Sequence, residues 1–260
     1  MGIIVYNGEP STNYYLHVEH PPAYTFAERN YEVTHVPGRN GDLVFDQGSY
    51  NNVDASYEVS VGSLDKFLPD LARGVSEWLH APTGYARLED SYTPQFYRLG
   101  MYTESASFTN ELMHAGRSTI TFNCKPQRFL KDGEKAVELP IAYGREASAT
   151  IVNPTNFTAI PEIIFGSNSL SDWNVYVTVE NSLGTVRYHF QGGVSRSGDI
   201  CIDGELMQCY MLGGGNYNTS LTLTDGVFAK FPPGETTVKI AYLGDATIQR
   251  ARVIPRWWTL

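Results

Sequence analysis

The feature that most constrains the fold is a recurrent short run in which apolar and polar residues alternate between Gly, Pro and Asn clusters. The run from Tyr57 to Val61, with Glu58 and Ser60 between its apolar residues, is one example. A period of two places the apolar side chains on one face of a strand. Tyr (17), Phe (12) and Gly (24) are abundant and charged residues reach only 18%, which favours strands joined by tight turns. The sequence therefore predicts an all-β chain with one helical segment.

The helical segment is predicted over residues 63–80, where apolar residues recur three or four positions apart. Ser63 is the expected N-cap. Pro69 cannot donate to the helical ladder, so a kink or a fresh start is expected there, with Pro69 in the first turn of the longer segment. Pro82 and Gly84 should close the helix. The apolar stripe consists of Leu64, Phe67, Leu68, Leu71, Val75, Trp78 and Leu79.

Two hairpins are predicted in the N-terminal half. The stretch Pro37–Asp42 contains Asn40-Gly41, a dipeptide that favours the positive φ angles of a tight turn, so a hairpin tip is expected there. Residues 85–129 contain two long strand-like runs on either side of residues 110–116. These two runs predict a second, longer hairpin.

The chain is expected to contain two domains. Charge rises and apolar periodicity fades within residues 130–148, as is typical of a boundary. We predict an N-terminal β domain over residues 1–135, a linker over 136–148 and a C-terminal domain over 149–260. The C-terminal part holds a series of short strand-like runs, which predict a β-sandwich because half-buried strands need a second sheet to cover their apolar faces.

Net charge and cysteine content limit the binding partners and the cellular compartment that are expected for the protein. A formal charge of −9 and a pI near 5.1 provide no basic stripe for sequence-specific nucleic-acid binding. The three cysteines Cys124, Cys201 and Cys209 are an odd number, which favours reduced thiols over a disulfide framework. No stretch has the roughly 18 apolar residues of a membrane span, so membrane insertion is not expected. Synthesis in a cytoplasm follows as the expectation.

The sequence carries no recognisable motif for a metal site or an activated nucleophile. Cys201 and Cys209, with His189 upstream, match no zinc spacing, and small apolar residues in a β core are the favoured interpretation. The chain has no Gly-x-Ser-x-Gly elbow, and the glycines at 213–215 lack the following Lys-Ser/Thr of a phosphate loop. No catalytic, cofactor-binding or metal-binding residue is predicted, and no cofactor.

Two alternatives concern carbohydrates. Glu89-Asp90, or Asp203 with Glu205, would be the carboxylates of a glycoside hydrolase, but structural or solvated roles are favoured. The second alternative is a glycan-binding β-sandwich module in which tryptophans stack on sugar rings. Core packing or subunit contacts are favoured for these tryptophans, which are Trp173, Trp257 and Trp258.

Several short segments together resemble the distal tail protein (Dit, phage tail component) family of long-tailed phages, mainly of Gram-positive hosts. In the C-terminal half, the resembling segments are Ile200–Glu205, the run from Phe228 to Gly234 and the closing Pro255–Trp258. In the N-terminal half, which carries most of the resemblance, they are Val36–Leu43, Gly48–Asn52, Glu77–Leu79, Gly84–Tyr92 and Phe122–Phe129.

The resemblance implies a non-enzymatic virion protein. It implies an N-terminal ring-forming β domain with a helix and a long hairpin, followed by a galectin-like β-sandwich. It also implies a hexameric ring at the distal end of the tail, a hub that contacts the major tail tube protein, the tape-measure protein and the tail-tip or tail-associated protein. The expected location is the virion tail tip, after assembly in the host bacterial cytoplasm.

A ring of identical copies needs an element that reaches a neighbour. A long strand hairpin offers unpaired backbone edges, and pairing across subunits would satisfy them. We predict that Pro94–Phe122 is this interlocking arm, with its tip at Asn110–His114.

Overall fold

The chain divides into two compact units. The computed structural model describes residues 2–167, 172–193, 198–243 and 247–260. Unit 1 comprises Met1–Arg128 with Leu260, and unit 2 comprises Phe129–Thr259. The boundary therefore precedes the linker expected at 136–148. Strands within that stretch join the sheets of unit 2, which explains why fading periodicity was a poor guide to the boundary.

Unit 1 contains an antiparallel sheet with the strand order β2-β1-β7-β8-β10-β6-β3, and β9 pairs with β10. Alternation along β6 is strict: Val53, Ala55, Tyr57, Val59 and Val61 are buried and the residues between them are not. The predicted all-β architecture with one helix is confirmed. The strands are β1 (Ile4–Tyr6), β2 (Glu9–Pro10), β3 (Leu16–Val18), β6 (Val53–Gly62), β7 (Ala86–Asp90), β8 (Phe96–Tyr102), β9 (Thr109–Leu112) and β10 (Ala115–Leu130).

The helix α1 (Leu68–His80) packs its apolar stripe against this sheet. It starts at Leu68 with Pro69 in its first turn, so the fresh start expected there is confirmed. Ser63 is not the N-cap, and Leu64 is 95% exposed, so the predicted start was wrong. Trp78 anchors the helix, because its Nε1 donates to the carbonyl of Tyr6 at 3.4 Å.

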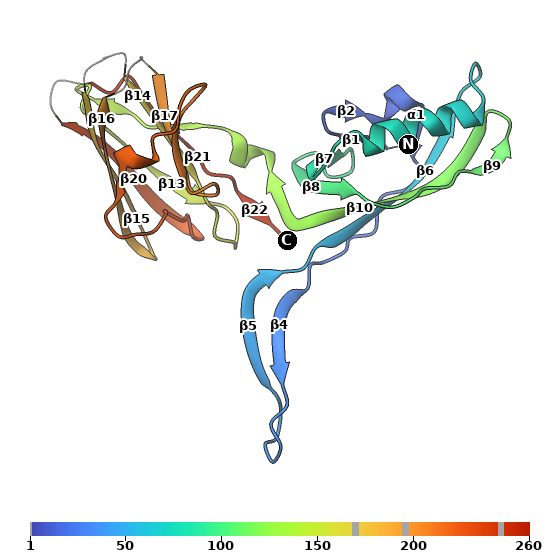
Figure 1. Ribbon diagram of the computed structural model, residues 1–260, viewed down its shortest axis with the longest axis horizontal. Helices are drawn as coiled ribbons and strands as arrows, with labels where there is room; N and C mark the ends of the chain where they lie inside the picture. The colour runs from blue at the N-terminus through green and yellow to red at the C-terminus, as the bar shows by residue number, and fades with distance from the viewer. Residues whose placement is uncertain (1, 168–171, 194–197, 244–246) are drawn as a thin grey trace. The chain divides into compact units, whose positions relative to one another are not determined.

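A separate two-stranded sheet is formed by β4 (Arg29–Thr34) and β5 (Leu43–Tyr50). The turn between them contains the predicted hairpin tip, and Gly38 and Gly41 adopt the positive φ values of 84° and 78° that glycine permits. We call residues 29–50 the arm (Figure 1). The arm predicted at Pro94–Phe122 was wrong, because β8 and β10 are neighbours within the main sheet of unit 1.

Unit 2 is a sandwich of two antiparallel sheets, as predicted, with the strand orders β11-β21-β14-β17-β18 and β12-β13-β20-β15-β16-β19. The strands of the two sheets are β11 (Val137–Glu138), β12 (Ile141–Ala142), β13 (Glu146–Asn153), β14 (Glu162–Ser167), β15 (Asp172–Asn181), β16 (Gly184–Gly193), β17 (Gly198–Asp203), β18 (Gln208–Met211), β19 (Leu221–Leu223), β20 (Gly234–Leu243) and β21 (Arg250–Ile254). The short strand β22 (Trp258–Thr259) belongs to neither sheet and pairs with β10.

Each unit has its own hydrophobic core. In unit 2, Phe165 from one sheet meets Phe190 and Tyr242 from the other at ring-centroid distances of 5.7 and 6.2 Å. In unit 1, Tyr6 and Phe122 pack at 4.9 Å. No helix within the described residues is long and apolar enough to cross a membrane.

Candidate functional site

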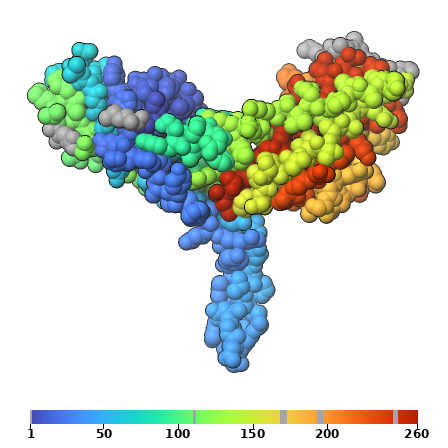
Figure 2. Space-filling view, turned by 180° about the vertical axis from the view of Figure 1, so that it is seen from behind, coloured from blue at the N-terminus to red at the C-terminus, as the bar shows by residue number. Residues whose placement is uncertain are grey.

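The arm is the most exposed regular element of unit 1. No residue of β4 or β5 is buried, whereas every second residue of β6 is. Figure 2 shows the two strands with no other element packed on the face in view. Among the described residues β4 and β5 pair only with each other, so both outer edges of the ribbon present free backbone groups. A two-stranded ribbon of this kind is at best marginally stable in water.

Apolar side chains lie on both faces of the arm. Opposite residues of an antiparallel pair share a face. The register pairs Val33 with Val44 and Tyr31 with Asp46 on one face, and Glu32 with Phe45 on the other. The four apolar residues Tyr31, Val33, Val44 and Phe45 are 50 to 58% exposed. Burying both faces would remove this apolar surface from water, so the ribbon is suited to insertion between other surfaces.

The base of the arm is held by charged side chains. Arg29 Nε donates to Asp46 Oδ1 at 3.0 Å, and a second guanidinium nitrogen pairs with Asp46 Oδ2. These bonds raise the pKa of Arg29 and lower that of Asp46. The Arg29 guanidinium also lies 5.5 Å from the Tyr50 ring, and Gly48 donates to Asp46 Oδ1 at 2.9 Å. The arm is thus ordered at its base without a core of its own.

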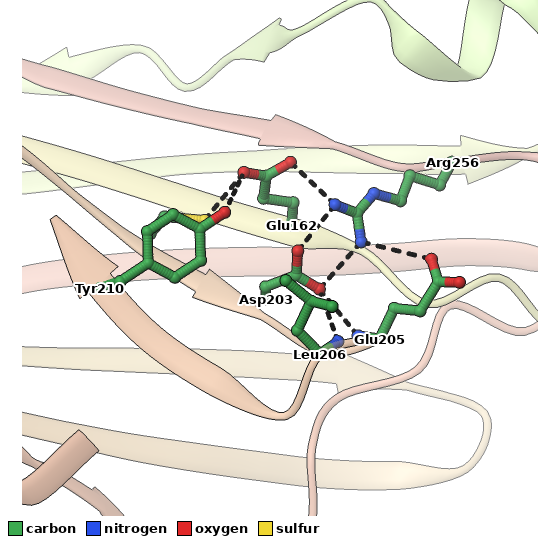
Figure 3. A network of polar contacts seen from close by, with 7 residues as sticks. Glu162, Asp203, Glu205, Leu206, Tyr210 and Arg256 are labelled. Atoms are coloured by element: carbon green, nitrogen blue, oxygen red, sulfur yellow. Dashed lines mark hydrogen bonds and ion pairs between the residues drawn. The ribbon is translucent and has the colours of Figure 1, made fainter. Parts of the chain in front are cut away.

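The densest polar network of unit 2 surrounds Arg256 (Figure 3). Its Nη1 donates to Asp203 Oδ1 at 2.9 Å, and its Nη2 donates to Asp203 Oδ2 at 2.8 Å and to Glu162 Oε2 at 3.1 Å. Cys201 Sγ donates to the other Glu162 oxygen at 2.8 Å. Burial acts to raise the pKa of Asp203, but the bonds from Arg256 outweigh it and lower that pKa.

This network argues against the hydrolase alternative. A glycosidase needs one protonated and one ionised carboxyl group, whereas Asp203 and Glu205 both pair with the guanidinium of Arg256, at 2.8 and 3.6 Å. The other pair is also engaged in structure. Glu89 forms an ion pair with Arg87, and Asp90 Oδ1 accepts hydrogen bonds from the backbone nitrogens of the following turn at 2.8 Å.

The residues considered for a metal site are not brought together. Cys209 lies in the core of unit 2 and burial raises its pKa to about 12, whereas Cys201 is bonded to Glu162. His189 lies in the opposite sheet, where its Nε2 is 2.8 Å from Asn174 Oδ1. Within the residues that the structure describes, no group of three His, Cys, Asp or Glu side chains could hold a metal ion.

The tryptophans considered for sugar stacking belong to the interior of unit 2. Trp173 is fully buried and Trp257 is 5% exposed. Trp258 is partly buried, stacks on Phe157 at 4.6 Å and donates from Nε1 to the Thr158 carbonyl at 3.0 Å. Trp258 also packs against the core of unit 2, so the packing interpretation of all three residues is confirmed.

Comparisons with known proteins show which solved structures this fold is similar to. No protein-family model and no curated protein matches the chain. Solved structures do match, and they show that the chain shares its fold with a distal tail protein of a phage.

The particular match is the Dit protein (gp 19.1) of phage SPP1, described as a paradigm of the hub adsorption apparatus in phages that infect Gram-positive bacteria. The TM-score is 0.67 at 15% identity, covering 94% of this chain and 100% of that one. A chain of the phage P2 baseplate in its activated conformation with Ca matches at 8% identity and a TM-score of 0.48, over 94% and 99% of the two chains. The predicted resemblance is thus confirmed in the fold.

Sequence reasoning found the turn of the arm but not the arm itself. The stretch Pro37–Asp42 predicts a hairpin tip through its Asn-Gly pair, whereas the strands on either side read as ordinary sheet strands. In β5 both alternating sets contain apolar residues, but in β4 the set Asn30, Glu32 and Thr34 is wholly polar, as in an ordinary half-buried strand. The pattern alone therefore does not distinguish the arm from a hairpin within a sheet. Sequence reasoning also missed Arg256, whose partners lie far from it along the chain.

Proposed function

We propose that this protein is a structural subunit of a phage tail, in which six copies form a ring at the distal end. The observation that carries the proposal is the full-length match to the Dit fold, together with an arm that is apolar on both faces. A fold hosts many functions, so the arm provides the independent physical argument. A neighbouring copy would cover its apolar faces and pair with its free edges.

The hub role is the second part of the proposal. A closed ring has two different sides, which can face the tail tube with its tape-measure protein on one side and the tail-tip protein on the other. The protein would have no catalytic role. The carboxylates of Asp203 and Asp90 both accept structural hydrogen bonds, from Arg256 and from the backbone of Tyr92 respectively, which supports a structural role for these two residues.

Mass measurement tests the ring. Six chains of 29.0 kDa give 6 × 29.0 = 174 kDa, so light scattering should show a species of that mass. A protein that stays at 29.0 kDa over the whole accessible concentration range would contradict the ring.

Location requires a separate measurement. Antibody fragments raised against unit 2 and bound to intact virions should appear at the tail end remote from the capsid in electron micrographs. Label spread along the whole tail, or on the capsid, would contradict the hub role while leaving the ring untouched.

A further inference from the structure

A small cavity in unit 1 combines two arginines with one carboxylate. It has a volume of about 30 Å³ and lies between the segment Pro22–Thr25 and the main sheet. Arg98 from β8, Arg128 near the end of β10 and Asp90 from β7 are among its lining residues. With all three side chains ionised, the two arginines and the one aspartate leave one positive charge without a counter-charge in the lining.

The two guanidinium groups have buried nitrogens without partners. Arg98 Nη1 and Arg128 Nε are inaccessible to solvent and, within the described residues, donate to no hydrogen-bond acceptor. Burial, and next the nearby Arg98 charge, lower the pKa of Arg128. A buried donor without an acceptor costs about 1–3 kcal/mol, and more when it is charged. The cavity therefore favours an electron-rich occupant.

The Asp90 carboxylate already accepts hydrogen bonds from other groups. Its Oδ1 accepts from the backbone nitrogens of Tyr92 and Thr93 at 2.8 Å, and its Oδ2 lies 3.3 Å from the Tyr57 hydroxyl. These bonds turn its oxygens toward the turn after β7 and toward β6. The Asp90 carboxylate is therefore part of the cavity wall. The second arginine charge of the lining still lacks a counter-ion, which a bound anion would supply.

The size of the cavity limits what can enter. A space of about 30 Å³ is enough for roughly two water molecules or one small ion. Phosphate-sized and larger anions, and the side chain of another protein, need more room. We infer that Arg98 and Arg128 bind a small monovalent anion of the size of chloride.

Such an ion would fix the chain segment that leads into the arm. The Tyr24 ring lies 5.5 Å from the Arg128 guanidinium carbon, and the Thr25 hydroxyl donates to the Asp54 carbonyl at 3.1 Å. An anion under this segment would hold Arg128 in place beneath Tyr24. The inference does not depend on the proposed function, since it concerns unit 1 by itself.

Bromide identifies the site directly. Crystals of the wild-type protein grown in sodium bromide should show an anomalous peak within hydrogen-bonding distance of Arg98 Nη1 and Arg128 Nε. A cavity that holds only water under these conditions would overturn the inference. This measurement uses no variant, so it does not depend on how a substitution folds.

Thermal unfolding provides the solution test. At constant ionic strength, replacing sodium gluconate by sodium chloride should raise the unfolding midpoint of the wild-type protein by a few degrees, because an ion bound to the folded state stabilises it. Arg98→Gln and Arg128→Gln should lose this rise. Arg73→Gln, a control on the exposed side of α1 with its side chain 70% exposed, should keep it. A rise that persists in Arg98→Gln would overturn the inference.

Discussion

Arg256 and Asp203 form a bidentate pair, with two nitrogen to oxygen distances of 2.9 and 2.8 Å and an Asp203 side chain only 2% exposed. Parallel bonds of this kind fix orientation as well as charge. Asp203 ends β17 and Arg256 follows β21. The pair therefore ties the last residues of unit 2 to its sandwich.

Removing Arg256 should be costly. Arg256→Met leaves the Asp203 carboxylate buried without its partner, and we expect a loss of about 3–5 kcal/mol in the free energy of unfolding. Lys239→Met is the matched control, because Lys239 pairs with Glu180 at 3.1 Å with both side chains about half exposed. It should cost about 0–1 kcal/mol. Urea unfolding of the full chain measures the cost of both substitutions. Equal costs would contradict the conclusion that Arg256 neutralises a buried carboxylate.

The same pair predicts a dependence on pH. The folded-state pKa of Asp203 is lowered, so its stabilisation is fully present above the unfolded value of about 3.9. It is lost as pH falls through the lowered folded value. Between about pH 5 and about pH 2, wild-type stability should therefore fall more steeply than that of Asp203→Asn. Parallel curves from urea unfolding would contradict this expectation.

Gly133 leaves room for the chain at Trp257. A β-carbon at Gly133 would lie 2.3 Å from the Trp257 backbone nitrogen, and the Gly133 carbonyl accepts from Arg256 N at 2.8 Å. Gly133→Ala should cost about 1–3 kcal/mol through overpacking. Gly215→Ala, where a β-carbon meets nothing within 4 Å, should change stability by less than about 0.5 kcal/mol. Thermal unfolding compares the two, and similar midpoints would be evidence against this close contact.

The start of α1 can be tested with two leucines. Leu71 is 3% exposed and Leu64 is 95% exposed. Leu71→Ala should cost about 2–5 kcal/mol, and Leu64→Ala should stay within about 0.5 kcal/mol. A large loss for Leu64→Ala in chemical unfolding would mean that the apolar stripe extends to residue 64, as its spacing suggested.

Local patterns predicted the elements well and the long-range placements poorly. Alternation identified β6, and Pro69 identified the true start of the helix, because both depend on neighbouring residues. Leu64 fits the helical spacing but precedes the proline, so spacing alone extended the stripe too far.

The arm and the Arg256 network could not be found in this way. Whether a hairpin lies in a sheet or stands apart depends on which strands pair with its edges, and both hairpins have strand-like sequences. Glu162 and Arg256 are 94 residues apart, and nothing local marks them as partners.

The most direct test of the account is the mass of a variant with charges placed on one face of the arm. Val33 and Val44 oppose each other and are 57 and 58% exposed, and Val152 on β13 is 59% exposed. If neighbouring copies cover the arm, the double variant Val33→Glu, Val44→Glu should remain at 29.0 kDa. The Val152→Glu control should form the ring of the wild type. A double variant that assembles as fully as the control would contradict the claim that the arm joins the copies.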